Sequence, residues 1–406
     1  MQSFRYEARE PSTGKKVKAE VQAASLQSAA SIVKQQGLVL IDVKPSIESS
    51  GGFFSRFTNR ISTKDKVLFS RQLSTLINAG LPIVQSLRNV SGQTQNKALQ
   101  VVIGKIVVDI EAGTSFSQAL AKHPRVFNEV FINLVAAGEA SGTLDKALER
   151  LADQQEKDAE LISKIRGAMV YPAIVIVVMV AVVGFMIVTV MPQVEKIYAD
   201  LPGANLPLIT RILLAVSRFT IKYWWVVLLV LFLSIFFTTK WARTMGGKEA
   251  IDKAKLKMPV FGPLFTKVYM ARFSRTGTTL VASGVPLIQM LDIVAKAVDN
   301  VHVGRSINKA TEKVKSGKSL SDSLKGDPNF TTLVPDMIQI GEQSGSLEDM
   351  LSKTADYYEK EVDNQIKTIS TIIEPILMVL LGIVAFTIVA AVLLPVYGLV
   401  NQTNIV

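Results

Sequence analysis

Three long runs without a charged residue constrain the fold of this chain more than any other feature. Met169–Met191, Tyr223–Thr239 and Pro375–Leu394 contain no Asp, Glu, Lys, Arg or His. A helix of about 20 apolar residues crosses the hydrocarbon core of a bilayer, and runs of this kind are rare in soluble cores. The middle run is shorter, and helix tilt or its flanking residues would accommodate it. We therefore predict three transmembrane helices.

Basic residues near the ends of these runs predict the orientation of the chain. Arg150, Lys157, Lys164 and Arg166 precede the first run, more basic residues follow the middle run, and no charged residue follows Leu394. Cytoplasmic segments of membrane proteins are enriched in Lys and Arg. We expect a cytoplasmic N-terminus and an extracytoplasmic C-terminus. The net charge of +11 then reflects topology, and we expect no nucleic-acid binding because the basic residues are not interleaved with aromatic ones.

The chain also contains an internal repeat. Phe69–Leu87 and Phe273–Leu291 share nine of 19 residues at an offset of 204, and the pattern Gly-Glu-x-Ser-Gly occurs at 138–142 and again at 341–345. Each copy precedes one of the outer apolar runs. Apolar residues recur with a period near 3.6 in the first copy, which indicates amphipathic helices. We expect helices over 64–78, 98–111, 115–122 and 127–137, and a last helix that begins near Leu144.

These patterns predict a mainly α membrane protein with two homologous cytoplasmic helical-bundle modules, three transmembrane helices and a small N-terminal ββαβ unit. The segments that we expect are an N-terminal cytoplasmic ββαβ unit (1–45), a linker (46–62), module 1 (63–167), a first transmembrane helix (168–191), an extracytoplasmic loop (192–222), a second transmembrane helix (223–239), module 2 (240–370), a third transmembrane helix (371–395) and an extracytoplasmic tail (396–406).

The repeated Gly-Glu-x-Ser-Gly could suggest a serine nucleophile. A hydrolase elbow, however, has the spacing Gly-x-Ser-x-Gly on a strand–turn–helix and needs a histidine partner. The chain has two histidines and no cysteine. We interpret the pattern as a joint in which the first glycine allows close helix packing, the second ends a helix, and Thr143 or Ser346 caps the next one. We therefore expect no catalytic, cofactor-binding or metal site, and no enzymatic activity.

The two glutamates of this pattern, Glu139 and Glu342, leave two alternatives. Their carboxylates could accept backbone N–H groups at a helix N-terminus within the module, or they could bind a basic group of the other module or of a partner. The prolines near the outer runs also come in pairs. Because proline interrupts helices, we expect Pro172, Pro192, Pro375 and Pro395 to mark the ends of the membrane helices.

The repeated stretches AGLPIVQSL, GEASGTL, YPAIV and VMP resemble the inner-membrane platform proteins of type II secretion systems and type IV pili (the GspF/PilC family). The resemblance covers essentially the whole chain. The residues that fall on the family's motifs are Arg71, Gly80, Pro82, Gly138, Glu139 and Gly142 in the first copy and Arg275, Gly284, Pro286, Gly341, Glu342 and Gly345 in the second. We expect these residues to be structural or to lie at partner interfaces.

The resemblance implies a multi-pass protein of the bacterial cytoplasmic (inner) membrane without enzymatic activity. It implies a platform that couples a hexameric cytoplasmic assembly ATPase to the polymerisation of pilins or pseudopilins. Other inner-membrane assembly proteins and further copies of the same chain are the remaining expected partners, and no cofactor is expected. The alternative is a small-molecule transporter or permease component, although the membrane runs lack the ionisable groups that transporters use.

Overall fold

A computed structural model describes residues 2–9, 16–23, 26–35, 37, 39–45, 61–199 and 208–403. The chain divides into two compact units, Met1–Ser62 with Gln95–Val101 and Thr63–Thr94 with Val102–Val406. Most of the linker expected at 46–62 lies outside the described residues.

The smaller unit contains a three-stranded antiparallel sheet. Its elements are β1 (Gln2–Arg9), β2 (Lys16–Ala23), α1 (Leu26–Gln35) and β3 (Val39–Pro45). The strand order is β2-β1-β3, so β1 is the central strand. Tyr6 and Ala8 are two residues apart on β1, so their side chains lie on the same face of the strand. Both are buried. Val33 of α1 is also buried, and α1 contacts all three strands.

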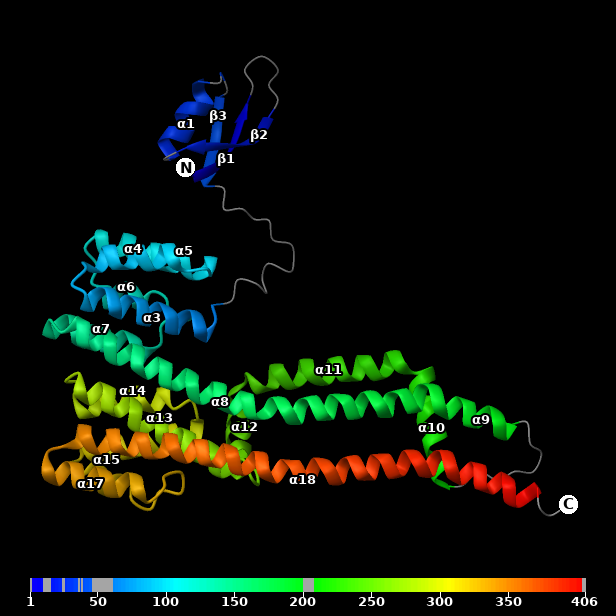
Figure 1. Ribbon diagram of the computed structural model, residues 1–406. Coiled ribbons are helices and arrows are strands. Elements are labelled where there is room, and N and C mark those ends of the chain that lie inside the picture. The colour runs from blue at the N-terminus through cyan, green and yellow to red at the C-terminus, as the bar shows by residue number, and fades with distance from the viewer. Residues whose placement is uncertain are drawn as a thin grey trace. The chain divides into compact units, whose positions relative to one another are not determined.

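Six helices that we call module 1 follow in the chain, and the last of them extends far beyond the bundle (Figure 1). They are α3 (Thr63–Asn78), α4 (Ile83–Gln93), α5 (Lys97–Glu111), α6 (Phe116–Ala121), α7 (Glu129–Ser141) and α8 (Leu144–Phe185). The helices expected from the 3.6-residue period are confirmed, with the start of α8 at the predicted Leu144.

The second copy, module 2, repeats this order after a connecting region. The connecting elements are the π-helix η1 (Met186–Val190), α9 (Met191–Ala199), α10 (Leu208–Lys222) and α11 (Trp224–Ala242). Module 2 comprises α12 (Met245–Lys257), α13 (Gly262–Ala282), α14 (Leu287–Ala297), α15 (Val301–Lys315), α16 (Leu320–Leu324), α17 (Leu333–Ser344) and α18 (Leu347–Thr403). Thus α13–α18 correspond in order to α3–α8.

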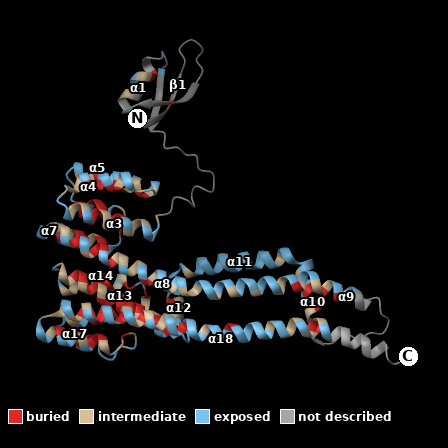
Figure 2. Cartoon of the chain, in the orientation of Figure 1, coloured by how far each residue is buried: buried red, intermediate tan, exposed pale blue. Residues whose placement is uncertain are grey.

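Equivalent buried aromatic residues lie at the centre of each module. In module 1 the ring centroids of Phe69, Phe127 and Phe131 are 5.6, 6.4 and 4.9 Å apart. In module 2 the rings of Phe273 and Phe330 meet edge to face at 5.2 Å. Aromatic pairs prefer such offset or tilted geometries. Buried residues are accordingly concentrated in the bundled helices and sparse along the extended parts of α8, α11 and α18 (Figure 2).

Three helices of the described residues are long and apolar enough to cross a membrane. They are Leu144–Lys196, Trp224–Ala242 and Leu347–Leu393. The structure thus contains three candidate membrane helices, and each of them includes one of the three predicted apolar runs, up to the described residues. The first and third are continuous with the last helix of a module, so module and membrane helix form one rod. The second, α11, has no buried residue, which is the exposure expected of a helix surrounded by lipid.

None of the four prolines that we expected at the ends of the membrane helices lies at a break in the helical segments. Pro172 lies inside α8, and Pro375 and Pro395 lie inside α18. Prolines are tolerated in membrane helices because neighbouring groups and local adjustments satisfy the freed backbone. Pro192 is the second residue of α9, directly after η1. A π-helical turn widens the helix and accommodates a residue that lacks the N–H donor.

The segment 192–222, expected to be a loop, contains α9 and α10 among its described residues. Met186, Met191, Val194 and Leu214 form a buried cluster with Ala391 of α18. The hydroxyl of Ser217 donates a hydrogen bond to the carbonyl of Ile187 in η1, with an O···O distance of 2.5 Å. Because a π-helical turn disturbs the regular hydrogen-bond ladder, this contact satisfies one of its carbonyl groups. The connecting segment thus packs against the far ends of the membrane helices.

Candidate functional site

The repeated joint between α7 and α8 is built on glycines that admit no side chain. A Cβ atom at Gly138 would lie 2.6 Å from Ala147 Cβ, and one at Gly341 would lie 2.9 Å from Leu347 Cα. Both distances are too short for non-bonded carbon atoms. Gly142 and Gly345 end α7 and α17 with φ of 71° and 68°. Glycine is favoured at such left-handed C-caps because it has no Cβ.

The carboxylate of Glu139 binds inside its own module. It accepts hydrogen bonds from the backbone N–H groups of Phe116 (2.6 Å to Oε1) and Ser117 (2.9 Å to Oε2). These two groups belong to the first turn of α6, where helical N–H groups have no partner within the helix. Ser115 completes the cap by accepting the N–H of Gln118. A negative charge is favourable at this end of a helix.

Glu342 makes the same contacts in module 2. It accepts from the N–H groups of Leu320 (2.7 Å) and Ser321 (3.2 Å), and additionally from the Ser321 hydroxyl (2.6 Å). Ser319 caps α16 as Ser115 caps α6. Of the two alternatives left by the sequence, the structure therefore shows the intramodular one for both glutamates. Each carboxylate ties the C-terminal part of α7 or α17 to the N-terminus of the short preceding helix.

The serine of the repeated pattern also serves the joint. The Ser141 hydroxyl donates to the carbonyl of Ala137 at 2.7 Å and shares a hydrogen bond with the Thr143 hydroxyl at 2.7 Å. Thr143 stands at the N-cap position of α8, but its side chain makes no cap hydrogen bond. The expectation that it caps α8 through its side chain is wrong, because its hydroxyl is paired with Ser141 instead. Ser344 and Ser346 share an equivalent hydrogen bond.

The turns after α3 and α13 also repeat. Gly80 and Gly284 have φ of 83° and 76°. Pro82 and Pro286 are the N-cap residues of α4 and α14, one position before the first helical turn. The fixed φ of proline suits both positions. These four motif residues therefore set the helix–turn–helix at the start of each module.

Arg71 clamps the first helix of module 1 to the last. Its Nε and Nη2 atoms donate to the two carboxylate oxygens of Glu156, each at 2.6 Å. Nη2 also donates to Asp153 Oδ1 at 2.5 Å. Bidentate pairs of this kind fix the relative position of two helices. Hydrogen bonds from Arg71 hold the pKa of the Glu156 carboxyl below its usual value.

Arg275 makes the corresponding clamp between α13 and α18. It donates from Nε to Glu359 Oε1 at 2.8 Å and from Nη2 to Asp356 Oδ1 at 2.5 Å. In this copy α8 lies over the clamp, and Lys157 Nζ is 3.8 Å from Glu359 Oε2. The side chains of Arg275 and Glu359 are only 17% and 13% exposed. The second clamp is thus part of the contact between the modules.

Module 1 contacts module 2 through α7 and α8, which lie against α13, α14 and α18. The buried Gln154 donates from Nε2 to Thr276 Oγ1 at 2.8 Å. The guanidinium of Arg150 donates to the carbonyl of Ala282, the last residue of α13. A cation is favourable at the C-terminus of a helix. The remaining ion pairs and hydrogen bonds of this contact include Lys164–Asp363 (2.7 Å), Lys296–Glu129 (2.8 Å) and Gln289–Asn133 (3.1 Å).

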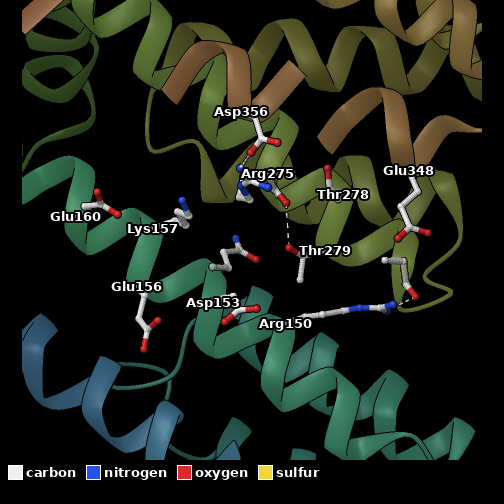
Figure 3. A pocket seen from close by; sticks show the side chains of 12 residues that line it. Arg150, Asp153, Glu156, Lys157, Glu160, Arg275, Thr278, Thr279, Glu348 and Asp356 are labelled. Carbon is white, nitrogen blue, oxygen red and sulfur yellow. Dashed lines mark hydrogen bonds and ion pairs between the residues drawn. The ribbon is translucent and has the colours of Figure 1, made fainter. Parts of the chain in front are cut away.

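A pocket of about 360 Å³ lies where α8, α13 and α18 meet. Figure 3 shows the side chains that line it. They include three basic residues (Arg150, Lys157 and Arg275) and five acidic residues (Asp153, Glu156, Glu160, Glu348 and Asp356). Contacts between domains permit relative movement unless the interface is large and hydrophobic. The contact between the modules can therefore shift without exposing an apolar core.

Sequence reasoning missed this contact between the modules. Its central residues, Gln154 and Thr276, correspond to Tyr357 and Gln72 in the other copy, so the repeat is not preserved there. The sequence signal for this contact is the loss of similarity between the two copies at these matched positions. Positions that only maintain the bundle stay alike in both copies. The hydrogen bonds of the motif residues Arg71, Glu139, Arg275 and Glu342, in contrast, are made within one module.

These features define a class of protein. It is a membrane-anchored chain with two copies of one helical module, each module continuous with a membrane-spanning helix. The family model described as "Type II secretion system (T2SS), protein F" matches residues 69–192 and again 273–395. The model of the N-terminal domain of the same family matches residues 1–44. The chain belongs to this family.

Characterised relatives align over nearly their full length. The type IV pilus assembly protein PilC of Thermus thermophilus is 38% identical, and the alignment covers 100% of both chains. PilC of Myxococcus xanthus is 36% identical over 98% of this chain and 94% of its own. The type II secretion system protein F of Pseudomonas aeruginosa is 34% identical over 99% of both chains.

Proposed function

We propose that this protein is the inner-membrane platform of a type IV pilus or type II secretion assembly machine. It couples a hexameric cytoplasmic assembly ATPase to the addition of pilin or pseudopilin subunits. Other inner-membrane assembly proteins and further copies of the chain complete the assembly, and the protein itself performs no enzymatic step. The names of its relatives support this function, since they are pilus assembly and secretion proteins.

The observation that carries the mechanical part of the proposal is the continuity of α8 and α18. α18 runs for 57 residues from the module 2 bundle into the membrane-spanning region without a break, and α8 does the same for module 1 over 42 residues. A helix of this length transmits displacement as a rod. Movement of a module by a cytoplasmic partner would therefore displace the membrane segment directly.

The proposed topology places both modules and the ββαβ unit of residues 1–45 in the cytoplasm. α9, α10 and the C-terminus lie on the outside, in agreement with the distribution of Lys and Arg around the spans. The chain has no cysteine, so single cysteines at Arg243 and Lys222 would report topology through an impermeant maleimide. We expect Lys222→Cys to be labelled in intact spheroplasts, and Arg243→Cys only after lysis.

Deletion of the gene followed by complementation tests the function. We expect the deletion strain to lose surface filaments or secretion of the exported proteins, and the wild-type gene to restore them. Insertion of Gly-Ser-Gly-Gly after Lys367 interrupts α18 just before the membrane. This variant should reach the membrane in normal amounts but fail to restore filaments.

The matched control is the same insertion after Arg243, at the turn between α11 and α12. It lengthens an existing turn and should restore filament assembly. Normal filaments and normal secretion in the deletion strain would overturn the proposed function. Full activity of the Lys367 insertion would reject the mechanical coupling through α18 and leave the platform role intact.

A further inference from the structure

The contact between the two modules joins two different faces. Module 1 contributes α7 and α8, whereas module 2 contributes α13 and α14, the counterparts of α3 and α4, together with the side of α18 that carries Glu359 and Asp363. Gln154–Thr276 and Arg150–Ala282 are its central hydrogen bonds. A contact between unlike faces of similar units is heterologous, and it leaves one face of each unit uncovered. Here those faces are the side of α17 and α18 that carries Ile340, Lys353 and Tyr357 in module 2, and the α3–α4 side of module 1.

The donor face is the set of module 2 residues at the positions that module 1 uses in the contact. It comprises Asp336, Lys353 and Tyr357, together with Ile340, which lies one turn after Asp336 on α17. Tyr357 is 48% exposed, whereas its counterpart Gln154 is 5% exposed because α13 covers it. Ile340, the counterpart of Ala137, is 50% exposed.

The acceptor face is the set of module 1 residues at the positions that module 2 uses. It comprises Leu68, Gln72, Asn78 and Gln85. Leu68 is 51% exposed, whereas the side chain of its counterpart Arg272 is 20% exposed in the contact with α8. Asn78 and Gln85 are also exposed. Ile340 on the donor face and Leu68 on the acceptor face therefore expose apolar side chains to solvent. The corresponding residue of the other module is less exposed in each case.

The chemistry of the two faces is complementary in the same way as that of the internal contact. Lys353 occupies the position of Arg150, and Asn78, the last residue of α3, occupies that of Ala282. Among the residues that the structure describes, the ion pair of Lys353 is with Asp349 one turn away on its own helix, and its side chain is 60% exposed. A lysine ammonium can thus reach the carbonyl groups at the C-terminus of α3, where a cation is favourable. Asp336 and Gln85, the counterparts of Asn133 and Gln289, retain the ability to hydrogen-bond.

The direction of the membrane helices permits this contact between two chains. α8 and α18 run side by side in the same sense, since Lys157 meets Glu359 and Lys164 meets Asp363 further along both helices. The rotation and translation that relate module 1 to module 2 therefore keep the membrane helices of the two modules parallel. The same operation, applied from module 2 to module 1 of the next chain, would keep the membrane helices of both chains in one membrane. A heterologous contact repeated in this way can close into a ring.

We propose that a second copy of this chain docks its acceptor face on the donor face of the first, repeating between chains the contact made between modules within one chain. The proposal specifies the surfaces of the homo-oligomer included in the proposed function. It does not require filament assembly, because the contact is detected in isolated membranes. Failure to detect the contact between chains is therefore distinguishable from failure of the protein to support filament assembly.

Cysteine crosslinking tests this contact directly because the natural chain has no cysteine. Two differently tagged full-length copies are co-expressed, one with Lys353→Cys and the other with Asn78→Cys, and native membranes are treated with a short bismaleimide. We expect a doubly tagged dimer at least fivefold more abundant than the dimer that either variant forms with itself. Absence of crosslinked dimers, or predominance of the Lys353→Cys dimer with itself, would overturn the proposal.

Two matched controls accompany the experiment. Arg150→Cys with Ala282→Cys in one chain should crosslink internally and change gel mobility without dimer formation, which verifies the reagent and the geometry. Val108→Cys lies on an exposed position of α5 outside both faces and should not crosslink to Lys353→Cys. A dimer of Val108→Cys with Lys353→Cys as abundant as that with Asn78→Cys would indicate random collision and would also overturn the proposal.

A second measurement does not depend on crosslinking. Ile340→Asp with Tyr357→Asp changes two exposed side chains and should leave the module folded, but it places charges in the donor face. We expect the purified protein in detergent to lose at least half of its oligomeric fraction by light scattering. Val108→Asp is the control and should retain it. An unchanged oligomeric mass in the double variant would contradict the docking surfaces proposed here.

Discussion

The two arginine clamps are chemically alike but differ in exposure. In module 1 the side chains of Arg71 and Glu156 are 36% and 42% exposed. In module 2 those of Arg275 and Glu359 are 17% and 13% exposed, because α8 covers them. The repeat therefore separates two kinds of feature. Those present in both copies maintain the bundle, whereas those that differ arise from the contact between the modules.

The glycine joints should give the largest effect and should affect both modules equally. Gly341→Val would force a side chain against Leu347 Cα, and Gly138→Val would do the same against Ala147. Neither neighbour can move without a shift of the backbone. We expect each variant to lose about 3 kcal/mol of unfolding free energy, measured by denaturant titration of the purified protein in detergent.

Gly104→Ala is the control for these joints. No atom lies within 4 Å of a Cβ at Gly104, which occupies a helix interior, so alanine should stabilise the helix by up to about 1 kcal/mol. A Gly341→Val variant that unfolds at the wild-type midpoint would contradict the role assigned to the joint. A loss confined to one module would contradict the equivalence of the two copies.

The local features of the modules could be predicted from the sequence because they depend on short-range rules. The 3.6-residue period located α3 and α7, and glycines at 80 and 142 marked the turns that follow them. The roles of Arg71 and Arg275 could not be predicted, because their carboxylate partners lie more than 80 residues away in sequence.

The errors came from local rules applied where distant contacts decide. Pro172 was expected to mark an end of a membrane helix, but α8 continues through it, as membrane helices tolerate proline. Residues 192–222 were expected to form a loop, but the burial of Leu214 against Met186 and Ala391 organises α10. The contact through Gln154 and Thr276 could not be predicted, because it depends on how the two modules pack against each other. The periodicity of the sequence indicates helices but not this packing.

The difference between the two clamps should appear when each arginine is removed. Arg275→Ala leaves the Glu359 carboxylate mostly covered and without its main partner, and we expect a loss of about 2 kcal/mol. Arg71→Ala leaves Glu156 accessible to water, and we expect a loss below about 1 kcal/mol. The same denaturant titration compares the two. Equal losses would show that α8 does not shield the second clamp.

The two glutamate caps should show a smaller difference. Glu139→Ala removes the acceptor of two backbone N–H groups, and Glu342→Ala removes that of the same two groups and a hydroxyl. We expect losses of about 1 kcal/mol for Glu139 and somewhat more for Glu342. Hydrogen exchange at the first turns of α6 and α16 provides the local measurement. Unchanged exchange at Phe116 and Ser117 in Glu139→Ala would contradict the cap.

The smallest effect is a dependence on pH of the exposed clamp in module 1. Arg71 lowers the pKa of Glu156 in the folded protein, so the pair stabilises the fold above the usual pKa near 4.5. This contribution is lost as pH falls through the lowered value, because the unfolded chain binds the proton more readily. The stability difference between wild type and Arg71→Ala should therefore be constant above pH 5 and shrink below about pH 4.5. Paired denaturant titrations at pH 7 and pH 4 measure it, with Gly104→Ala as a variant whose difference from wild type should not change. A difference that grows on acidification would show that another group controls the clamp.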